Sequence, residues 1–160
     1  MAARKTSTAR GRFIAKHPEK YVGNPDRIIF RSSWEVTYMK WLDNNPAVLR
    51  WASEELAIPY LNPVKSAVAG RPVISQYYPD FIVLYRDVHG NILKEIVEIK
   101  PYSESVQRPG MSERDKQSFA VNQAKWLAAA EYAQKNGATF RVVTEKTLFL
   151  NKIPKGITKA

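Results

Sequence analysis

The chain has 160 residues, 44% of them hydrophobic, which is enough for one domain with a buried core. The lack of cysteine excludes disulfides, thiolate metal sites and a cysteine nucleophile, and two histidines are too few for a histidine-rich metal centre. The net charge of +10 indicates a polyanionic partner. No segment has the apolar length of a signal peptide or a membrane span, so we expect neither.

The positive charge is concentrated towards the two ends of the chain. Residues 1–31 carry eight Lys and Arg against two acids, residues 101–160 carry ten against five, and residues 32–100 carry seven against eight. We expect a basic N-terminal arm or draped loop over residues 1–26, a core domain over residues 27–150, and a basic tail over residues 151–160. Basic flanks would bind a phosphate backbone while the acidic centre binds metal. The tail lysines alternatively serve only solubility.

The first predicted helix begins at Ser32 and runs to about Asn45, where Pro46 ends it. Glu35 falls inside its apolar arc, and a carboxylate that faces a core is costly unless it is paired or bound to metal. Glu35 is therefore a candidate functional acid. The alternative is a capping box, in which Glu35 bonds the Ser32 amide, and the local pattern favours neither interpretation.

Three strands are predicted next. The first covers about residues 56–60, and a turn-rich insertion at 62–72 follows it. The second covers about 73–86 and the third 92–100, and the turn at 87–91 joins these two into a hairpin.

The candidate catalytic residues lie on this hairpin. They are Asp80 in its first strand and Glu98 and Lys100 in its second. Two hard carboxylate ligands can hold Mg²⁺ and leave sites for water and phosphate, and an amine beside them can orient the attacking water. Asp80 and Glu98 share a face only if the paired residue numbers add up to about 178, which requires an odd-length loop such as Val88-His89-Gly90, or a bulge. This trio is typical of magnesium-dependent phosphodiester cleavage. Lys100 alternatively acts only as an ion-pair partner of Glu98.

A polar loop is predicted from residue 101 to about 110. Ser112 then caps a long helix from Glu113 to about Asn136, and Gly137 ends it. A strand at 139–144 completes a strand–helix–strand crossover, which is normally parallel, and a helical turn follows at 145–150. The order helix, three strands, helix, strand predicts an α/β core.

The order of these elements, together with Glu35, Asp80 and Glu98-Ile99-Lys100, resembles the PD-(D/E)XK restriction-endonuclease-like superfamily. Further motifs resemble the head completion nucleases of tailed phages, which are related to the endonuclease subunit of certain heteromeric transposases. These motifs are Arg31-Ser32-Ser33-Trp34-Glu35, Trp41-Leu42-Asp43-Asn44-Asn45-Pro46, Trp51 with Ser53-Glu54, Ile58-Pro59-Tyr60, Glu98-Ile99-Lys100-Pro101 and Val143-Thr144-Glu145. The resemblance extends from Tyr21 to about Leu150.

The resemblance implies a restriction-endonuclease-like core with a mixed sheet and a metal-dependent DNA endonuclease activity. Its implied metal ligands are Glu35, Asp80, Glu98 and the Ile99 backbone carbonyl, with Lys100 as the catalytic amine. The implied cofactor is Mg²⁺, for which Mn²⁺ can substitute. The number of ions and the oligomeric state stay open.

The resemblance also implies where such a protein works. It would act on double-stranded DNA, packaged or terminal, before tail joining, in the host bacterial cytoplasm during assembly or at the virion neck. Its implied protein partners are the phage portal or connector and other head-completion proteins. Alternatives on the same fold are a structural neck or head-closure protein that binds DNA without cleaving it, and a transposition or repair endonuclease.

Three further residues are candidates for DNA binding. Arg31 would contact a phosphate or pair with Glu35 or a surface acid. Gln123 and Lys125 lie on the long helix, where related folds carry DNA-contacting residues, but placement on a solvated face explains them equally well. The four tryptophans are better explained as core packing than as base-stacking residues.

Overall fold

The structure is a computed structural model that describes residues 10–148. Its centre is a four-stranded sheet in the order β3-β6-β7-β8. These strands are β3 (Val48–Ser53), β6 (Phe81–Arg86), β7 (Ile92–Ile99) and β8 (Thr139–Val143). The first three are antiparallel neighbours and β8 runs parallel to β7, which confirms the predicted α/β fold with a mixed sheet.

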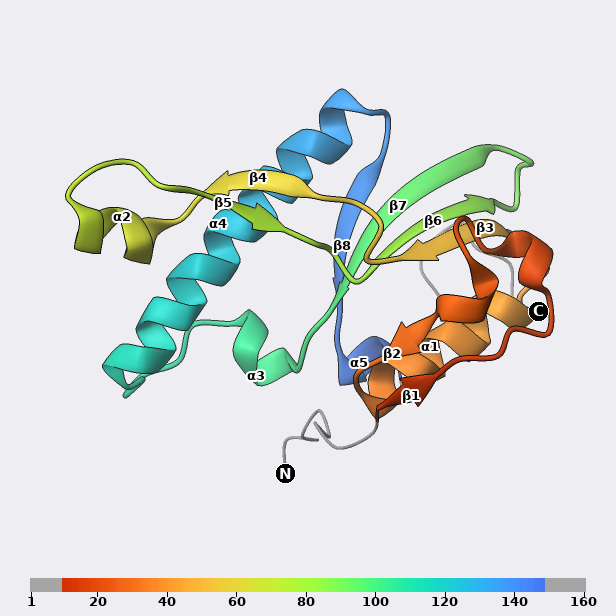
Figure 1. Cartoon of the computed structure of the whole chain (residues 1–160), viewed down its shortest axis with the longest axis horizontal. Coiled ribbons are helices and arrows are strands. Elements are labelled where there is room, and N and C mark those ends of the chain that lie inside the picture. The colour runs from red at the N-terminus through yellow and green to blue at the C-terminus, as the bar shows by residue number, and fades with distance from the viewer. Residues whose placement is uncertain (1–9, 149–160) are drawn as a thin grey trace.

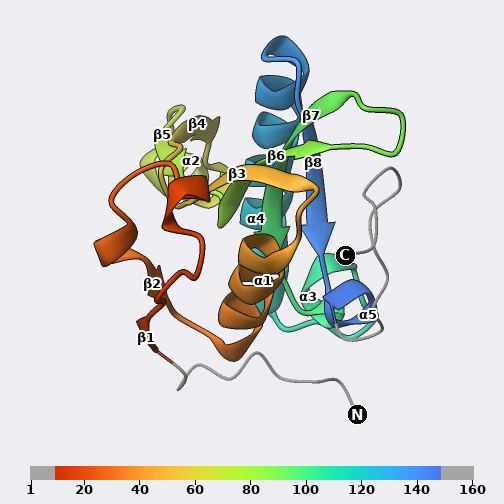
Figure 2. The same ribbon diagram turned by 90° about the vertical axis from the view of Figure 1, so that its right-hand side faces the viewer.

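Two helices pack against the sheet, α1 (Ser33–Asn44) and α4 (Glu113–Lys135) (Figure 1). Neighbouring residues of β7 show that the helices lie on opposite faces, because successive side chains of a strand point to opposite sides. Val97 belongs to the core cluster that contains the buried residues of α1, and Ile96 belongs to the cluster that contains Ala129 of α4. Figure 2 looks at the molecule from the α1 side, with α1 in front of the strands.

Both helices begin and end close to where the sequence predicts. The Ser32 side chain caps α1 by accepting a hydrogen bond from the Glu35 N–H (3.1 Å), and Ser112 caps α4 in the same way through the Asp115 N–H (3.1 Å). Gly137, just after α4, has a φ of 65°, a left-handed conformation that glycine adopts without steric cost.

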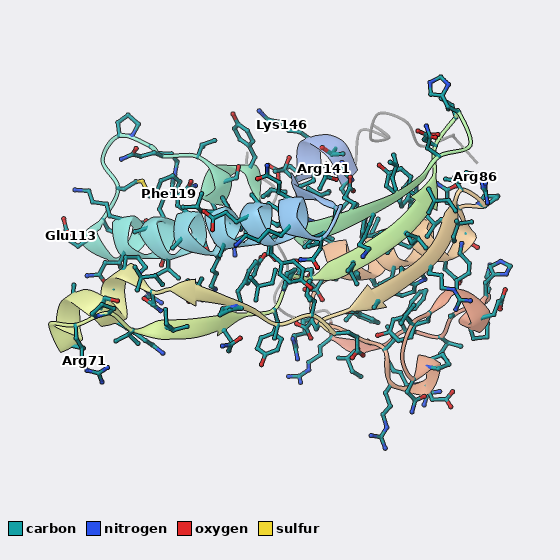
Figure 3. The ribbon with its side chains drawn as sticks, turned by 90° about the horizontal axis from the view of Figure 1, so that it is seen from above. Arg71, Arg86, Glu113, Phe119, Arg141 and Lys146 are labelled. Atoms are coloured by element: carbon teal, nitrogen blue, oxygen red, sulfur yellow. The ribbon has the colours of Figure 1, made fainter. Side chains whose placement is uncertain are left out.

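The strand predicted over residues 73–86 is two strands that belong to different sheets. β4 (Ile58–Leu61) and β5 (Ile74–Tyr77) form a separate hairpin that carries α2 (Pro63–Ala69) between them. Figure 1 shows this hairpin extending away from the main sheet, and Figure 3 shows Arg71 at its outer end. The insertion predicted as turns thus contains a helix.

β3 is absent from the predicted elements, which place the first strand at residues 56–60. It pairs with β6 and forms one edge of the sheet. Trp51 of β3 is fully buried, so this strand contributes to the core as well as to the sheet.

From residue 10 onward, the predicted N-terminal arm packs on the domain. β1 (Gly11–Arg12) pairs with β2 (Ile29–Phe30), and Phe13 and Tyr21 join the core around α1. Residues 10–26 thus fit the alternative of a loop draped on the domain, and Phe13 is a core residue that the sequence did not predict. Residues 1–9 and the predicted tail at 151–160 lie outside the described residues.

The same segment supports the end of α1. Asp43 is buried and accepts hydrogen bonds from the backbone N–H groups of Lys16 (2.8 Å) and His17 (3.0 Å). The Lys20 ammonium donates to three backbone carbonyls at the C-terminal end of α1, at 2.8–3.0 Å. These carbonyls have no partner within the helix, so a cation there is favourable.

Two short helices follow the ends of β7 and β8, and they contact each other. They are α3 (Tyr102–Ser105), within the predicted polar loop, and α5 (Glu145–Leu148). The Tyr102 N–H donates to Glu145 Oε2 (2.9 Å), and the Lys146 ammonium lies 3.4 Å from the centroid of the Tyr102 ring. Figure 3 labels Lys146 beside α5. Between residues 10 and 148, no helix combines the length and apolarity that crossing a membrane requires.

Candidate active site

Asp80 lies in the short connection between β5 and β6, directly after the buried Pro79. Its Oδ2 accepts a hydrogen bond from the backbone N–H of Ile99 at 2.7 Å. Its backbone carbonyl accepts from the Glu54 N–H at 3.2 Å. Asp80 is thereby attached both to the end of β7 and to the turn that follows β3.

The pairing of β6 with β7 sets which side chains share a face. Phe81 pairs with Val97 and Arg86 with Ile92, so paired residue numbers add up to 178, the sum that a shared face for Asp80 and Glu98 requires. The hairpin closes through the Asp87 N–H, which donates to the Asn91 carbonyl at 2.8 Å and leaves a three-residue loop, Val88-His89-Gly90. Continued by one position, this register sets Asp80 opposite Glu98. Both residues then lie on the α4 side of the sheet, where Ile96 also points.

Glu98 is buried, and its two carboxylate oxygens have different neighbours. Oε2 accepts a hydrogen bond from the Tyr77 hydroxyl at 2.7 Å. Oε1 lies 4.0 Å from the Lys100 ammonium. Burial raises the pKa of Tyr77 well above its usual range, and the Glu98 charge raises the pKa further. Tyr77 therefore keeps its proton and donates to the Glu98 carboxylate.

A second amine approaches this group from α4. The Lys125 ammonium lies 5.6 Å from the centroid of the Tyr77 ring and 5.9 Å from that of Tyr60. Burial lowers the pKa of Lys125, the Lys100 charge lowers the pKa further, and the Glu98 charge opposes both effects. Of the two interpretations from the sequence, placement on a solvated face is wrong for Lys125, because this side chain is half-buried beside Glu98 and Lys100.

Gln123 lies elsewhere. It is exposed, and two residues along a helix correspond to a rotation of about 200°, so it points away from the side of α4 that carries Lys125. The structure therefore brings Lys125, but not Gln123, to the candidate site.

Glu35 and Arg31 meet at the start of α1. Glu35 is buried, and its Oε2 accepts a hydrogen bond from the Arg31 backbone N–H at 2.8 Å. This resembles the predicted capping box, except that the carboxylate reaches the amide one residue before Ser32. The Arg31 side chain forms an ion pair with Glu54, which is the alternative of a surface acid considered from the sequence.

The described residues fit a magnesium site with few protein ligands. Mg²⁺ is usually bound through one or two carboxylates together with water and substrate phosphate. Asp80, just before β6, and Glu98, near the end of β7, supply two hard oxygen donors. Within residues 10–148, no group of three or more His, Cys, Asp or Glu side chains is arranged to hold a metal ion. Glu35 is thus not gathered with Asp80 and Glu98 into the expected three-acid group, and its role as a third ligand stays a prediction, as does that of the Ile99 carbonyl.

Two residues beside the site were not predicted from the sequence. The sequence predicted one continuous strand through Tyr77 and Asp80. It did not predict the break between β5 and β6, which lets the Tyr77 ring face Glu98. Glu54 has a φ of 56°, which is unusual for a residue other than glycine, and its backbone contacts Asp80 while its side chain pairs with Arg31. The Ser53-Glu54 motif was the available signal for the second residue.

Comparison with known proteins identifies the family. Residues 45–145 match the family model described as "TnsA-like endonuclease N terminal", a range that includes Asp80, Glu98 and Lys100. The chain is 32% identical over 148 residues to the head completion nuclease of Enterobacteria phage T4, and the alignment covers 86% of this chain and 92% of that relative. The chain therefore belongs to the TnsA-like endonuclease family, which has the restriction-endonuclease-like fold, and it is related to the phage head completion nucleases.

Proposed function

We propose that this protein is a magnesium-dependent DNA endonuclease that acts in head completion of a tailed phage. The observation that carries this proposal is the placement of Asp80 beside Glu98 and Lys100 at the end of β7. The fold, the family match and the name of the phage relative support the same class of activity. The substrate would be packaged or terminal double-stranded DNA, cut in the host cytoplasm before tail joining.

Asp80 and Glu98 would hold the ion, with Mn²⁺ as a substitute for Mg²⁺. When bound, such an ion polarises the phosphoryl oxygen and lowers the pKa of water. Lys100 would orient the attacking water, because it directly follows β7 and its ammonium lies 4.0 Å from a Glu98 oxygen. The same charge offsets the repulsion between the two carboxylates.

Arg31 and Lys125 would bind DNA phosphates on either side of these acids. Arg31 is exposed and lies before α1, and Lys125 lies on α4, which packs on the other face of the sheet. Cations on both sides would hold the backbone over the carboxylates. Phosphate contacts of this kind carry no base specificity, which fits a nuclease that positions DNA by its backbone.

Nicking of supercoiled plasmid DNA with Mg²⁺ or with EDTA tests the proposed activity. The wild type should nick only with the divalent ion, and Asp80→Ala and Lys100→Ala should each lose about two orders of magnitude in rate. Lys94→Ala is the matched control, because Lys94 is an exposed lysine of β7 on the same face as Glu98. Equal nicking by all four proteins would refute the assignment.

Head completion by the same variants tests the place of this activity in assembly. If cleavage is the essential step, phage that carry Asp80→Ala should accumulate heads that do not join tails. Completion of heads by variants that no longer cleave DNA would instead favour a structural head-closure protein that only binds DNA. Electron microscopy of lysates distinguishes these outcomes.

A further inference from the structure

We propose that Tyr77 is a positioning residue that fixes the orientation of the Glu98 carboxylate for the metal. This inference rests on the function proposed above. Tyr77 is supplied by the β4–β5 hairpin, which is not part of the main sheet. The candidate site would then consist of the main sheet and one side chain from this hairpin.

The contact between the two side chains is short and shielded from water. Tyr77 is 4% exposed and Glu98 is 9% exposed, and 2.7 Å separates the phenol oxygen from Oε2. A hydroxyl that donates to an ionised carboxylate forms one of the stronger hydrogen bonds in proteins. Because this donor engages Oε2, the carboxylate presents Oε1 on the side of Lys100.

The Tyr77 ring is itself held in place, so it can act as a fixed support. Tyr77 is the last residue of β5, pairs with Ile58 of β4, and packs in the core cluster that includes Ile96 and Ala129. The Lys125 ammonium lies 5.6 Å from the ring centroid, on the α4 side. A rotation of the phenol away from Glu98 would require this packing to open.

Tyr60 provides a matched control within the same cluster. It is also buried, at 6% exposed, and its ring centroid lies 5.9 Å from the Lys125 ammonium. Its hydroxyl, however, accepts a hydrogen bond from the Asn62 side-chain amide at 3.2 Å. Both substitutions remove a buried tyrosine hydroxyl near Lys125. Tyr60→Phe removes a hydroxyl that bonds Asn62, whereas Tyr77→Phe removes the hydroxyl that donates to Glu98.

Mn²⁺ binding, followed by electron paramagnetic resonance of the full chain, tests the proposal. Loss of a hydrogen bond that orients a metal ligand typically costs about 10- to 100-fold in metal affinity or activity. Tyr77→Phe should weaken Mn²⁺ binding by this factor and raise the Mg²⁺ concentration needed for half-maximal nicking, and excess Mg²⁺ should restore the rate. Tyr60→Phe should match the wild type. Equal Mn²⁺ affinity in the two variants would overturn the proposal.

A double variant separates positioning from a general effect on folding. If Tyr77 acts through Glu98, Tyr77→Phe should weaken Mn²⁺ binding no further in a chain that already carries Glu98→Gln. A further loss of tenfold or more in that background would overturn the proposal, because it would show an effect that does not pass through Glu98. A wild type that neither binds Mn²⁺ nor nicks DNA would refute the proposed nuclease function itself. A wild type that does both, with Tyr77→Phe unaffected, would refute only the positioning role.

Discussion

The Asp80 carboxylate accepts a hydrogen bond from the backbone N–H of Ile99, with 2.7 Å between Oδ2 and the nitrogen. This bond connects the β5–β6 connection to the last residue of β7 and so holds one acid beside the strand that carries the other. Because an ionised acceptor strengthens the bond, Asp80 combines a structural contact with a candidate chemical role. The two contributions can be separated by choice of substitution.

Asp80→Asn should abolish nicking without destabilising the fold. The asparagine carbonyl can still accept from the Ile99 N–H, but the negative charge is lost. Asp80→Ala should lose nicking as well and, because it leaves that N–H without its acceptor, lower the free energy of unfolding by about 1–3 kcal/mol relative to Asp80→Asn. Urea unfolding measures the difference, and the exposed Asp26→Asn is the control. Equal stability of the two Asp80 variants would contradict a structural role for this bond.

Arg31→Gln should weaken DNA binding and reduce its salt dependence. One lost phosphate contact lowers the slope of log affinity against log salt by about one. Glu54→Gln should not weaken binding, since it only releases Arg31 from its ion pair. Fluorescence anisotropy with labelled duplex at several salt concentrations measures both. If Glu54→Gln weakens binding as much as Arg31→Gln does, then Arg31 acts by ordering the turn after β3 rather than by contacting DNA.

Phe13→Ala should destabilise the domain by about 3–5 kcal/mol, because it removes a large buried ring from the core around α1. The neighbouring Ile14→Ala should change stability by no more than about 0.5 kcal/mol, since Ile14 is 75% exposed. Urea unfolding of both variants makes the comparison. Small effects of both substitutions would contradict the prediction and would favour the other alternative from the sequence, an extended arm that does not stabilise the domain.

Buried tyrosine hydroxyls should make the fold sensitive to alkali. Burial raises the pKa of Tyr38 above its ordinary value of 10.0, so the folded chain keeps a proton that the unfolded chain releases. Below about pH 10 the Tyr38 hydroxyl is protonated in both states, so its contribution to the free energy of unfolding is fully present. That contribution is lost as the pH rises from there towards the raised pKa of the folded state. Tyr38→Phe should therefore show a smaller loss of stability than the wild type between about pH 8 and about pH 11. The control is Tyr78→Phe, which removes an exposed hydroxyl, and an unchanged pH slope in Tyr38→Phe would contradict the prediction.

Local patterns predicted the parts of the fold that depend on local chemistry. Ser32 and Ser112 marked the starts of the two main helices, because capping requires only a side chain and an amide three residues later. The sequence named the condition for a shared face of Asp80 and Glu98, an odd loop such as Val88-His89-Gly90 or a bulge, and the register of β6 and β7 meets that condition. In these places short-range geometry determines the structure.

Long-range contacts explain what the sequence did not reveal. The burial of Asp43 depends on backbone N–H groups more than 25 residues earlier in the chain. β3 lacks a clear alternation, since Val48, Trp51 and Ala52 are all buried. Tyr77 acquires its contact with Glu98 only because the hairpin folds back beside β7, which no local pattern encodes.

The most direct test of the central claim is a Mn²⁺ titration, followed by electron paramagnetic resonance, of the wild type, Asp80→Asn, Glu98→Gln and the control Asp26→Asn. If Asp80 and Glu98 together bind a divalent ion, each single substitution at the site should weaken Mn²⁺ binding severely, and the control should bind as the wild type does. The same Mn²⁺ affinity in all four proteins would contradict the account, because neither acid would then be a metal ligand.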